Sequence, residues 1–159
     1  MSAYVKRSID PDMSVESAAR HEAGHAVMAI ALGYKVSGAF VCADGTGGVS
    51  AGPGRGRRRD PLAEAMICWA GGIADGTAGT QISEGDALLM RAMRYRWSSI
   101  VALRELALRR YEECGMGPAV GAVAALLVAN VGRRVAGAVI HEAALGAVPA
   151  LADAAEDAR

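Results

Sequence analysis

The chain is poor in aromatic residues and in cysteine. Phe, Trp and Tyr make up 4% of its 159 residues, so the core must be built from aliphatic side chains and Met. Such a core favours closely packed helices over a β-sandwich. The three cysteines are far apart and form no C-x-x-C pair, which argues against a disulfide framework and a thiolate zinc site. Reduced cysteines indicate a cytoplasmic protein.

An excess of charge of one sign is also missing. Lys plus Arg and Asp plus Glu each number 17, so no overall field attracts nucleic acid or an anionic membrane. Arg far outnumbers Lys, a bias typical of a GC-rich bacterial genome. No apolar segment opens the chain, so we expect no signal peptide. The uncharged run from Cys114 to Val131 is rich in Ala and Gly, and it predicts a buried helix rather than a membrane span.

The length predicts a single domain over residues 1–159, with residues 1–13 as a polar, disordered arm. Ser14 is a good N-cap for a helix from Val15 to Leu32, which Gly33 ends. Strands are expected at 35–42 and 49–50, joined by a turn. The Gly- and Arg-rich residues 52–60 predict a mobile basic loop.

Helices are predicted for the remainder. Asp60 and Pro61 are typical of a helix start, and that helix is expected to end near Asp75. A loop to Ile82 and a long helix from Ser83 to Cys114 follow. Residues 119–155 predict further helix, bent near Gly132 and at 146–149. The expected fold is mainly α, with a small β-hairpin or sheet after the first helix.

The first predicted helix contains His21-Glu22-Ala23-Gly24-His25, an H-E-x-x-H pattern. His21 and His25 are one helical turn apart on the same face, so both imidazoles can bind one zinc ion. Glu22 lies beside the open coordination position, where its carboxylate can take a proton from metal-activated water. The pattern therefore predicts a hydrolytic zinc site.

Such a site needs a third protein ligand from elsewhere in the chain. The extended form H-E-x-x-H-x-x-G-x-x-H is excluded, because Met28 stands in place of the Gly and no His follows. His141, the other histidine, is interpreted as a structural or exposed helix residue. The acidic candidates are Asp75, Glu84 and Asp86, and Asp86 opens a predicted helix, a rigid position that suits a ligand.

The order of these segments resembles the peptidase domain of the FtsH family, the membrane-anchored AAA metalloproteases. His21 to Ala26 is similar to that family's zinc motif, and residues 70–76 resemble its Gly-Gly-x-x-Ala-Glu segment, with Asp for Glu. Residues 79–87 resemble the loop and helix start that hold its third ligand. The resemblance implies a zincin-like fold, His21, His25 and Asp86 as zinc ligands, Glu22 as catalytic base and Asp75 as a carboxylate supporting a ligating His.

The resemblance also implies an activity, zinc-dependent hydrolysis of peptide bonds in peptides or unfolded proteins. The chain contains no G-x-x-x-x-G-K-[ST] phosphate loop, so the expected activity is independent of ATP. A separate ATPase or a homo-oligomer is left open as a partner, and the substrate-binding residues are unknown. The strand from Val36 to Cys42 is expected to offer a free edge to an extended substrate.

Two other functions compete with the enzyme. In one, the site is a catalytically silent, metal-stabilised module that recruits a partner protein. In the other, Arg55 and Arg57–Arg59 bind nucleic acid. No aromatic residues are interleaved with these arginines to stack on bases, so we expect no nucleic-acid partner. A structural zinc site is usually closed by four protein ligands, and only three are apparent, which favours the enzyme.

Overall fold

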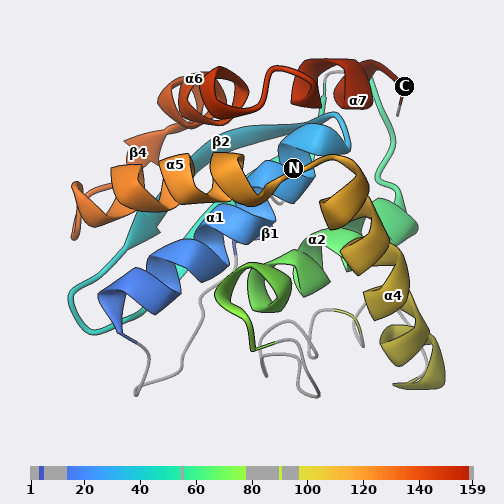
Figure 1. Cartoon of the computed structure of the whole chain (residues 1–159), viewed down its shortest axis with the longest axis horizontal. Helices are drawn as coiled ribbons and strands as arrows, with labels where there is room; N and C mark the ends of the chain where they lie inside the picture. The colour runs from blue at the N-terminus through green and yellow to red at the C-terminus, as the bar shows by residue number, and fades with distance from the viewer. Residues whose placement is uncertain (1–3, 6–13, 55, 78–89, 91–96, 158–159) are drawn as a thin grey trace.

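The computed structural model describes residues 4–5, 14–54, 56–77, 90 and 97–157. Within them the fold is mainly helical with one small antiparallel sheet, as the sequence predicts (Figure 1). The helices are α1 (Val15–Ala31), α2 (Pro61–Asp75), α4 (Trp97–Glu113), α5 (Gly117–Val128), α6 (Gly137–Ala147) and α7 (Leu151–Asp157). The strands are β1 (Tyr4–Val5), β2 (Tyr34–Val41), β3 (Gly47–Pro53) and β4 (Val135–Ala136).

The helix α1 forms where the sequence predicts it and for the predicted reason. The Ser14 hydroxyl accepts a hydrogen bond from the Ser17 N–H at 3.1 Å, which caps the first turn. At the other end Gly33 has a φ of 72°, a left-handed conformation that stops the helix. Every residue from Ala18 to Ala31 is buried except Arg20. Small Ala and Gly side chains let α1 lie at the centre of the molecule, against α2, α5, β2 and β3.

The helix α2 also has its predicted bounds. The Asp60 carboxylate accepts from the Leu62 N–H at 2.9 Å, Pro61 occupies the first turn, and Gly76 ends the helix at a φ of 81°. Trp69 is buried and donates from its indole N–H to the Ile100 carbonyl at 2.8 Å. This bond joins α2 to α4.

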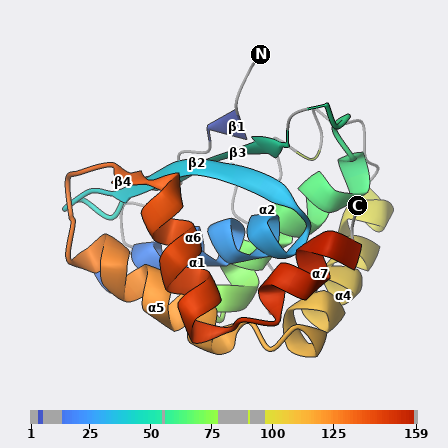
Figure 2. The ribbon, with the colours of Figure 1, turned by 90° about the horizontal axis from the view of Figure 1, so that it is seen from above.

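The sheet forms one layer on one side of the helices, in the order β1-β3-β2-β4 (Figure 2). The predicted hairpin is present as β2 and β3, but β3 is longer than the expected 49–50. Pairing with β2 explains the difference, since β2 supplies partners for the backbone from Gly47 to Pro53. The first two residues of the predicted loop at 52–60 are therefore strand.

The C-terminal third departs most from the prediction. The expected helix over 119–155 is divided into α5, α6 and α7, and β4 lies between the first two. Gly132 has a φ of 77°, and Val135 and Ala136 pair with Ala39 and Gly38 of β2. A two-residue strand leaves no periodic signal in a sequence, because its pairing partner decides it. The predicted start of the long helix at Ser83 lies outside the described residues.

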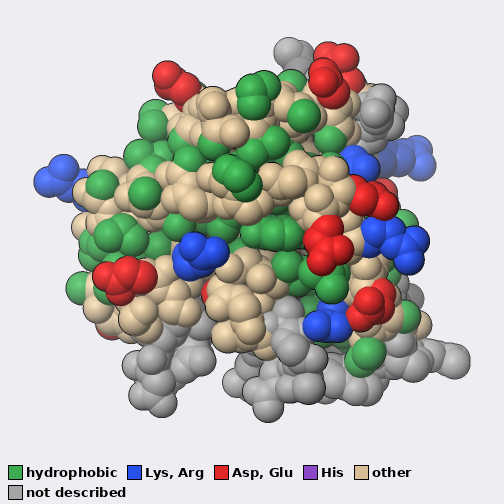
Figure 3. Space-filling model, viewed as in Figure 1, with side chains coloured by type: hydrophobic (Ala, Val, Ile, Leu, Met, Phe, Trp, Pro, Cys, Tyr) green, Lys and Arg blue, Asp and Glu red, His purple; other side chains and the backbone are tan. Residues whose placement is uncertain are grey.

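The uncharged helix α5 crosses the face of the molecule shown in Figure 3, where hydrophobic side chains and backbone dominate its band. Its inner residues, among them Val120, Val123 and Leu127, are buried in the core. In the part of the chain that the structure describes, no helix has the length and apolarity needed to cross a membrane.

Candidate metal centre

The H-E-x-x-H residues lie inside the molecule, on α1 where it faces α2. His21 is 1% exposed, and Glu22 and His25 are 0% exposed. The two imidazole rings have centroids 4.7 Å apart and meet edge to face at 80°. Histidines one helical turn apart are thus brought together, as their spacing predicts.

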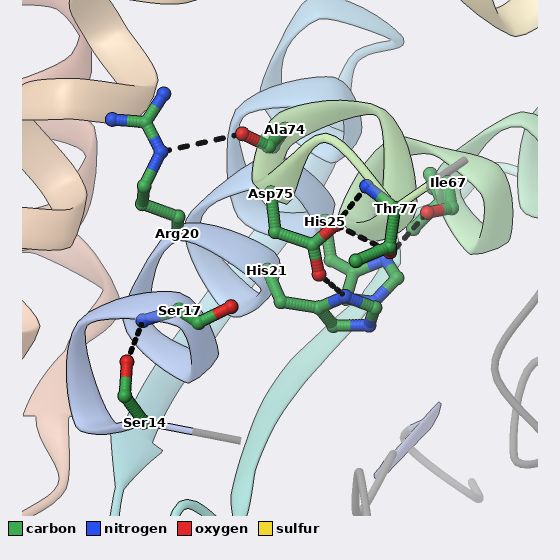
Figure 4. A network of polar contacts seen from close by, with 9 residues as sticks. All are labelled: Ser14, Ser17, Arg20, His21, His25, Ile67, Ala74, Asp75 and Thr77. Carbon is green, nitrogen blue, oxygen red and sulfur yellow. Dashed lines mark hydrogen bonds and ion pairs between the residues drawn. The ribbon is translucent and has the colours of Figure 1, made fainter. Parts of the chain in front are cut away.

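Each of the two histidines is oriented through its Nδ1 atom by an acceptor on α2 (Figure 4). Nδ1 of His21 lies 2.7 Å from a carboxylate oxygen of Asp75, and Nδ1 of His25 lies 2.6 Å from the carbonyl oxygen of Ile67. A carboxylate and a carbonyl can only accept, so Nδ1 donates in both rings. In a neutral imidazole this leaves the lone pair on Nε2, the atom that ligates a metal.

Gly71 of α2 shows that the two Nε2 atoms converge. A Cβ atom added to Gly71 would lie 2.6 Å from Nε2 of His21 and closer still to Nε2 of His25. Both nitrogens therefore border the same point, against a helix backbone that carries no side chain there. Two neutral imidazoles whose Nε2 atoms lie this close together fit a zinc ion held by two His ligands.

Glu22 lies against the first residue of β3. A Cβ atom at Gly47 would come within 2.7 Å of Glu22 Cγ and 3.2 Å of its carboxyl carbon. Only glycine at this position leaves room for the Glu22 side chain. The site thus lies between α1, α2 and the start of β3, and glycines of the last two elements make space for it.

Asp75, the last residue of α2, is held on two sides. Its other carboxylate oxygen accepts from the backbone N–H of Thr77 at 2.9 Å and also from the Thr77 hydroxyl. Burial raises the pKa of Asp75, but the hydrogen bonds from His21 and Thr77 outweigh it and bring the pKa below its ordinary value. Asp75 is therefore ionised at neutral pH, and its charge keeps the Nδ1 proton on His21.

The third ligand implied by the resemblance, Asp86, lies outside the described residues, as does Glu84. Among the described residues, no group of three or more His, Cys, Asp and Glu side chains is placed to hold a metal ion. Asp75 contacts the Nδ1 side of His21, away from the point where the Nε2 atoms converge. His141 lies half-buried on α6.

A small hollow lies between β2, β3 and α2. Tyr34, Ala51, Glu64 and Ile67 line it, and it encloses about 250 Å³, its open mouth included. Ile67 also contributes to the histidine pair, because its carbonyl accepts from His25.

The basic segment has contacts within the domain. Arg57 donates to the Gly33 carbonyl at 3.0 Å, and Arg59 donates twice to the Glu64 carboxylate, at 2.6 and 3.1 Å. Side chains placed in this way brace the end of α1 and the start of α2. The role of these arginines is thus at least partly structural.

Three contributors to the site were not identified from the sequence, namely Gly47, Gly71 and the backbone carbonyl of Ile67. Gly71-Gly72 inside an otherwise Ala- and Ile-rich helix is the signal that indicates close approach to another group. A backbone carbonyl has no sequence signal.

Comparison with known proteins does not assign the chain to a family, since no family model, no curated protein and no solved structure matches it.

Proposed function

We propose that the chain is a zinc-dependent endopeptidase of the FtsH type, which hydrolyses peptide bonds in peptides or unfolded proteins. The observation that carries the proposal is the convergence of two buried imidazoles on Gly71, each with Nδ1 donating to an acceptor on α2. A purely structural pair of histidines has no need of two aligned Nε2 atoms bordering one side-chain-free point. The order of motifs along the chain adds the likeness to FtsH.

In this proposal His21, His25 and Asp86 hold the zinc ion, which when bound polarises the peptide carbonyl and acidifies water. Glu22 takes a proton from the attacking water and passes it to the leaving amine. Its burial keeps bulk water away from the carboxylate that handles this proton.

Asp75 acts through His21. By accepting a hydrogen bond from Nδ1 of His21, Asp75 fixes the orientation of the ring and raises the basicity of Nε2. The Ile67 carbonyl does the same for His25 without a charge. One ligand is thus supported by a carboxylate and the other by a backbone group.

The test of the reaction compares the purified protein with Glu22→Gln on an unstructured protein such as casein, with and without a chelator. Gln has the size of Glu and cannot accept the proton, so turnover should fall by about 10²–10⁴-fold while zinc content stays unchanged. Glu142→Gln is the matched control, because Glu142 also follows a histidine but is exposed on α6. Equal cleavage by the wild type and Glu22→Gln would contradict the proposal.

The ligands are tested by metal analysis. We expect about one zinc per chain, lost in His25→Ala and retained in His141→Ala. Asp86→Ala should weaken zinc binding strongly and Glu84→Ala should not. Zinc bound without any cleavage of several unfolded substrates would instead favour the partner-binding module.

We also propose that activity is limited to loosely folded substrates. The sequence holds no phosphate-binding loop with which to drive the unfolding of a protein, so added ATP should not change the rate. We also propose a cytoplasmic location, with which the three free cysteines agree. A separate ATPase or a homo-oligomer stays a proposal from the resemblance to FtsH.

A further inference from the structure

The strand that borders the site on the sheet side is β3, not β2. β2 is an inner strand, paired with β3 on one side and with β4 at Gly38 and Ala39 on the other. The free edge expected on β2 is therefore interrupted by β4 at these two residues. The edge nearest the site is the outer side of β3.

β3 reaches the candidate site at two places. Gly47 lies against Glu22, and Ala51 lines the hollow that Ile67 connects to His25. An extended peptide paired along this edge would pass Gly47, which lies against the proposed base. Backbone groups along a sheet edge bind such a peptide by adding it as a strand.

Part of that edge is already paired with the chain's own N-terminal segment. Tyr4 and Val5 form β1, antiparallel to β3, with Tyr4 opposite Ala51 and Val5 opposite Ser50 (Figure 2). Ala51 is thus shared by β1 and the hollow. A peptide that follows the whole edge must displace β1.

We propose that β1 is an intramolecular competitor of the substrate, so that the N-terminal segment controls access to the β3 edge. A pairing of two residues is short enough to be reversible, while its attachment to the chain gives it a high effective concentration. This inference rests on the proposed function for the nature of the substrate, but the competition itself is a binding equilibrium and needs no catalysis.

The test measures binding in a Glu22→Gln background, where no peptide is cut. The probe is a fluorescent peptide with the sequence of residues 1–8, MSAYVKRS, and the readout is fluorescence anisotropy. A variant lacking residues 1–5 should bind the probe at least about threefold more tightly than the full chain, because its edge is always available. Hydrogen exchange should show protection of β3 when the probe binds.

Two substitution variants separate backbone pairing from side-chain effects. Successive residues of a strand direct their N–H groups to opposite sides, so one of Tyr4 and Val5 donates toward β3. The double change Tyr4→Pro with Val5→Pro removes that donor whichever it is, and should behave like the truncation. Tyr4→Ala with Val5→Ala keeps both donors and should behave like the full chain.

The inference is overturned if truncation leaves the affinity unchanged, if no variant binds the probe, or if bound probe leaves β3 unprotected. Identical behaviour of the two double variants also overturns it. If the wild type has no peptidase activity but truncation still tightens binding of the probe, the proposed function alone is refuted. If the wild type has peptidase activity but truncation does not change the affinity for the probe, the competition alone is refuted.

Discussion

Replacing Gly71 with alanine tests the convergence of the two histidines without removing a ligand. In most helix positions Gly→Ala is favourable, raising the free energy of unfolding by about 0.4–1 kcal/mol. At Gly71 the added Cβ would lie 2.6 Å from Nε2 of His21, whereas ordinary non-bonded contacts are about 3.5–4.0 Å. The rings must therefore move by about 1 Å, because the obstructing atom belongs to a rigid helix.

Such a shift is large on the scale of metal coordination. Metal–ligand distances tolerate about 0.2 Å, so a movement of about 1 Å takes at least one imidazole out of bonding range. We expect the zinc affinity of Gly71→Ala to fall about 100-fold or more. Removing a residue that hydrogen-bonds to a metal ligand lowers metal affinity by about 10–100-fold, and displacing a ligand itself should cost at least as much. Overpacking costs about 1–3 kcal/mol and the helix gains about 0.4–1 kcal/mol, so the free energy of unfolding of the metal-free variant should fall by up to about 2.6 kcal/mol.

The matched control is Gly121→Ala in α5, where an added Cβ meets no atom within 4 Å. That variant should gain about 0.4–1 kcal/mol and bind zinc as the wild type does. Zinc affinity is measured by competition with a chromogenic chelator, and stability by urea unfolding of metal-free protein. If Gly71→Ala binds zinc normally and is as stable as Gly121→Ala, the two Nε2 atoms do not converge on Gly71 in solution.

Three further predictions concern neighbouring features. Asp75→Ala should lower zinc affinity about 10–100-fold in the same chelator competition, because His21 loses the acceptor that orients it. Burial, together with the charge of Lys35, lowers the pKa of His141 from its ordinary 6.5, so the unfolded chain binds more protons and stability falls as the pH drops below 6.5. Urea unfolding at several pH values should therefore show that the free energy of unfolding falls less steeply with decreasing pH in His141→Gln than in the wild type. The same dependence on pH in both proteins would contradict the lowered pKa of His141. Trp69→Phe removes the hydrogen bond to Ile100, whose carbonyl keeps its helical donor in α4, and should lower the free energy of unfolding by about 0.5–1.5 kcal/mol.

The parts of the fold predicted correctly are those that local chemistry decides. Ser14, Asp60 and Pro61 act on their own helix ends, so α1 and α2 begin where the sequence indicates. The pairing of His21 with His25 is equally local, because helical geometry alone brings together residues four apart.

The parts that were missed depend on residues far apart in the chain. β4 exists because β2 offers it a partner, and β1 because β3 does. The approach of Gly71 to the histidines depends on how α2 packs against α1, which the spacing of either helix does not specify. The supporting role of Asp75 beside a histidine was expected from a resemblance alone, and its bond to His21 is a contact across 54 positions.

The central position of α1 has a consequence for how the site is lost. From Ala18 on, α1 is packed against the sheet, α2, α5 and α7, so the amides of this part exchange with solvent only when the whole domain opens. The histidines and their acceptors then separate in one cooperative step, and no partly opened form keeps half of the site. Amide exchange in α1 should accordingly report the global free energy of unfolding, while α7 and the strands at the sheet edges exchange through smaller, local openings.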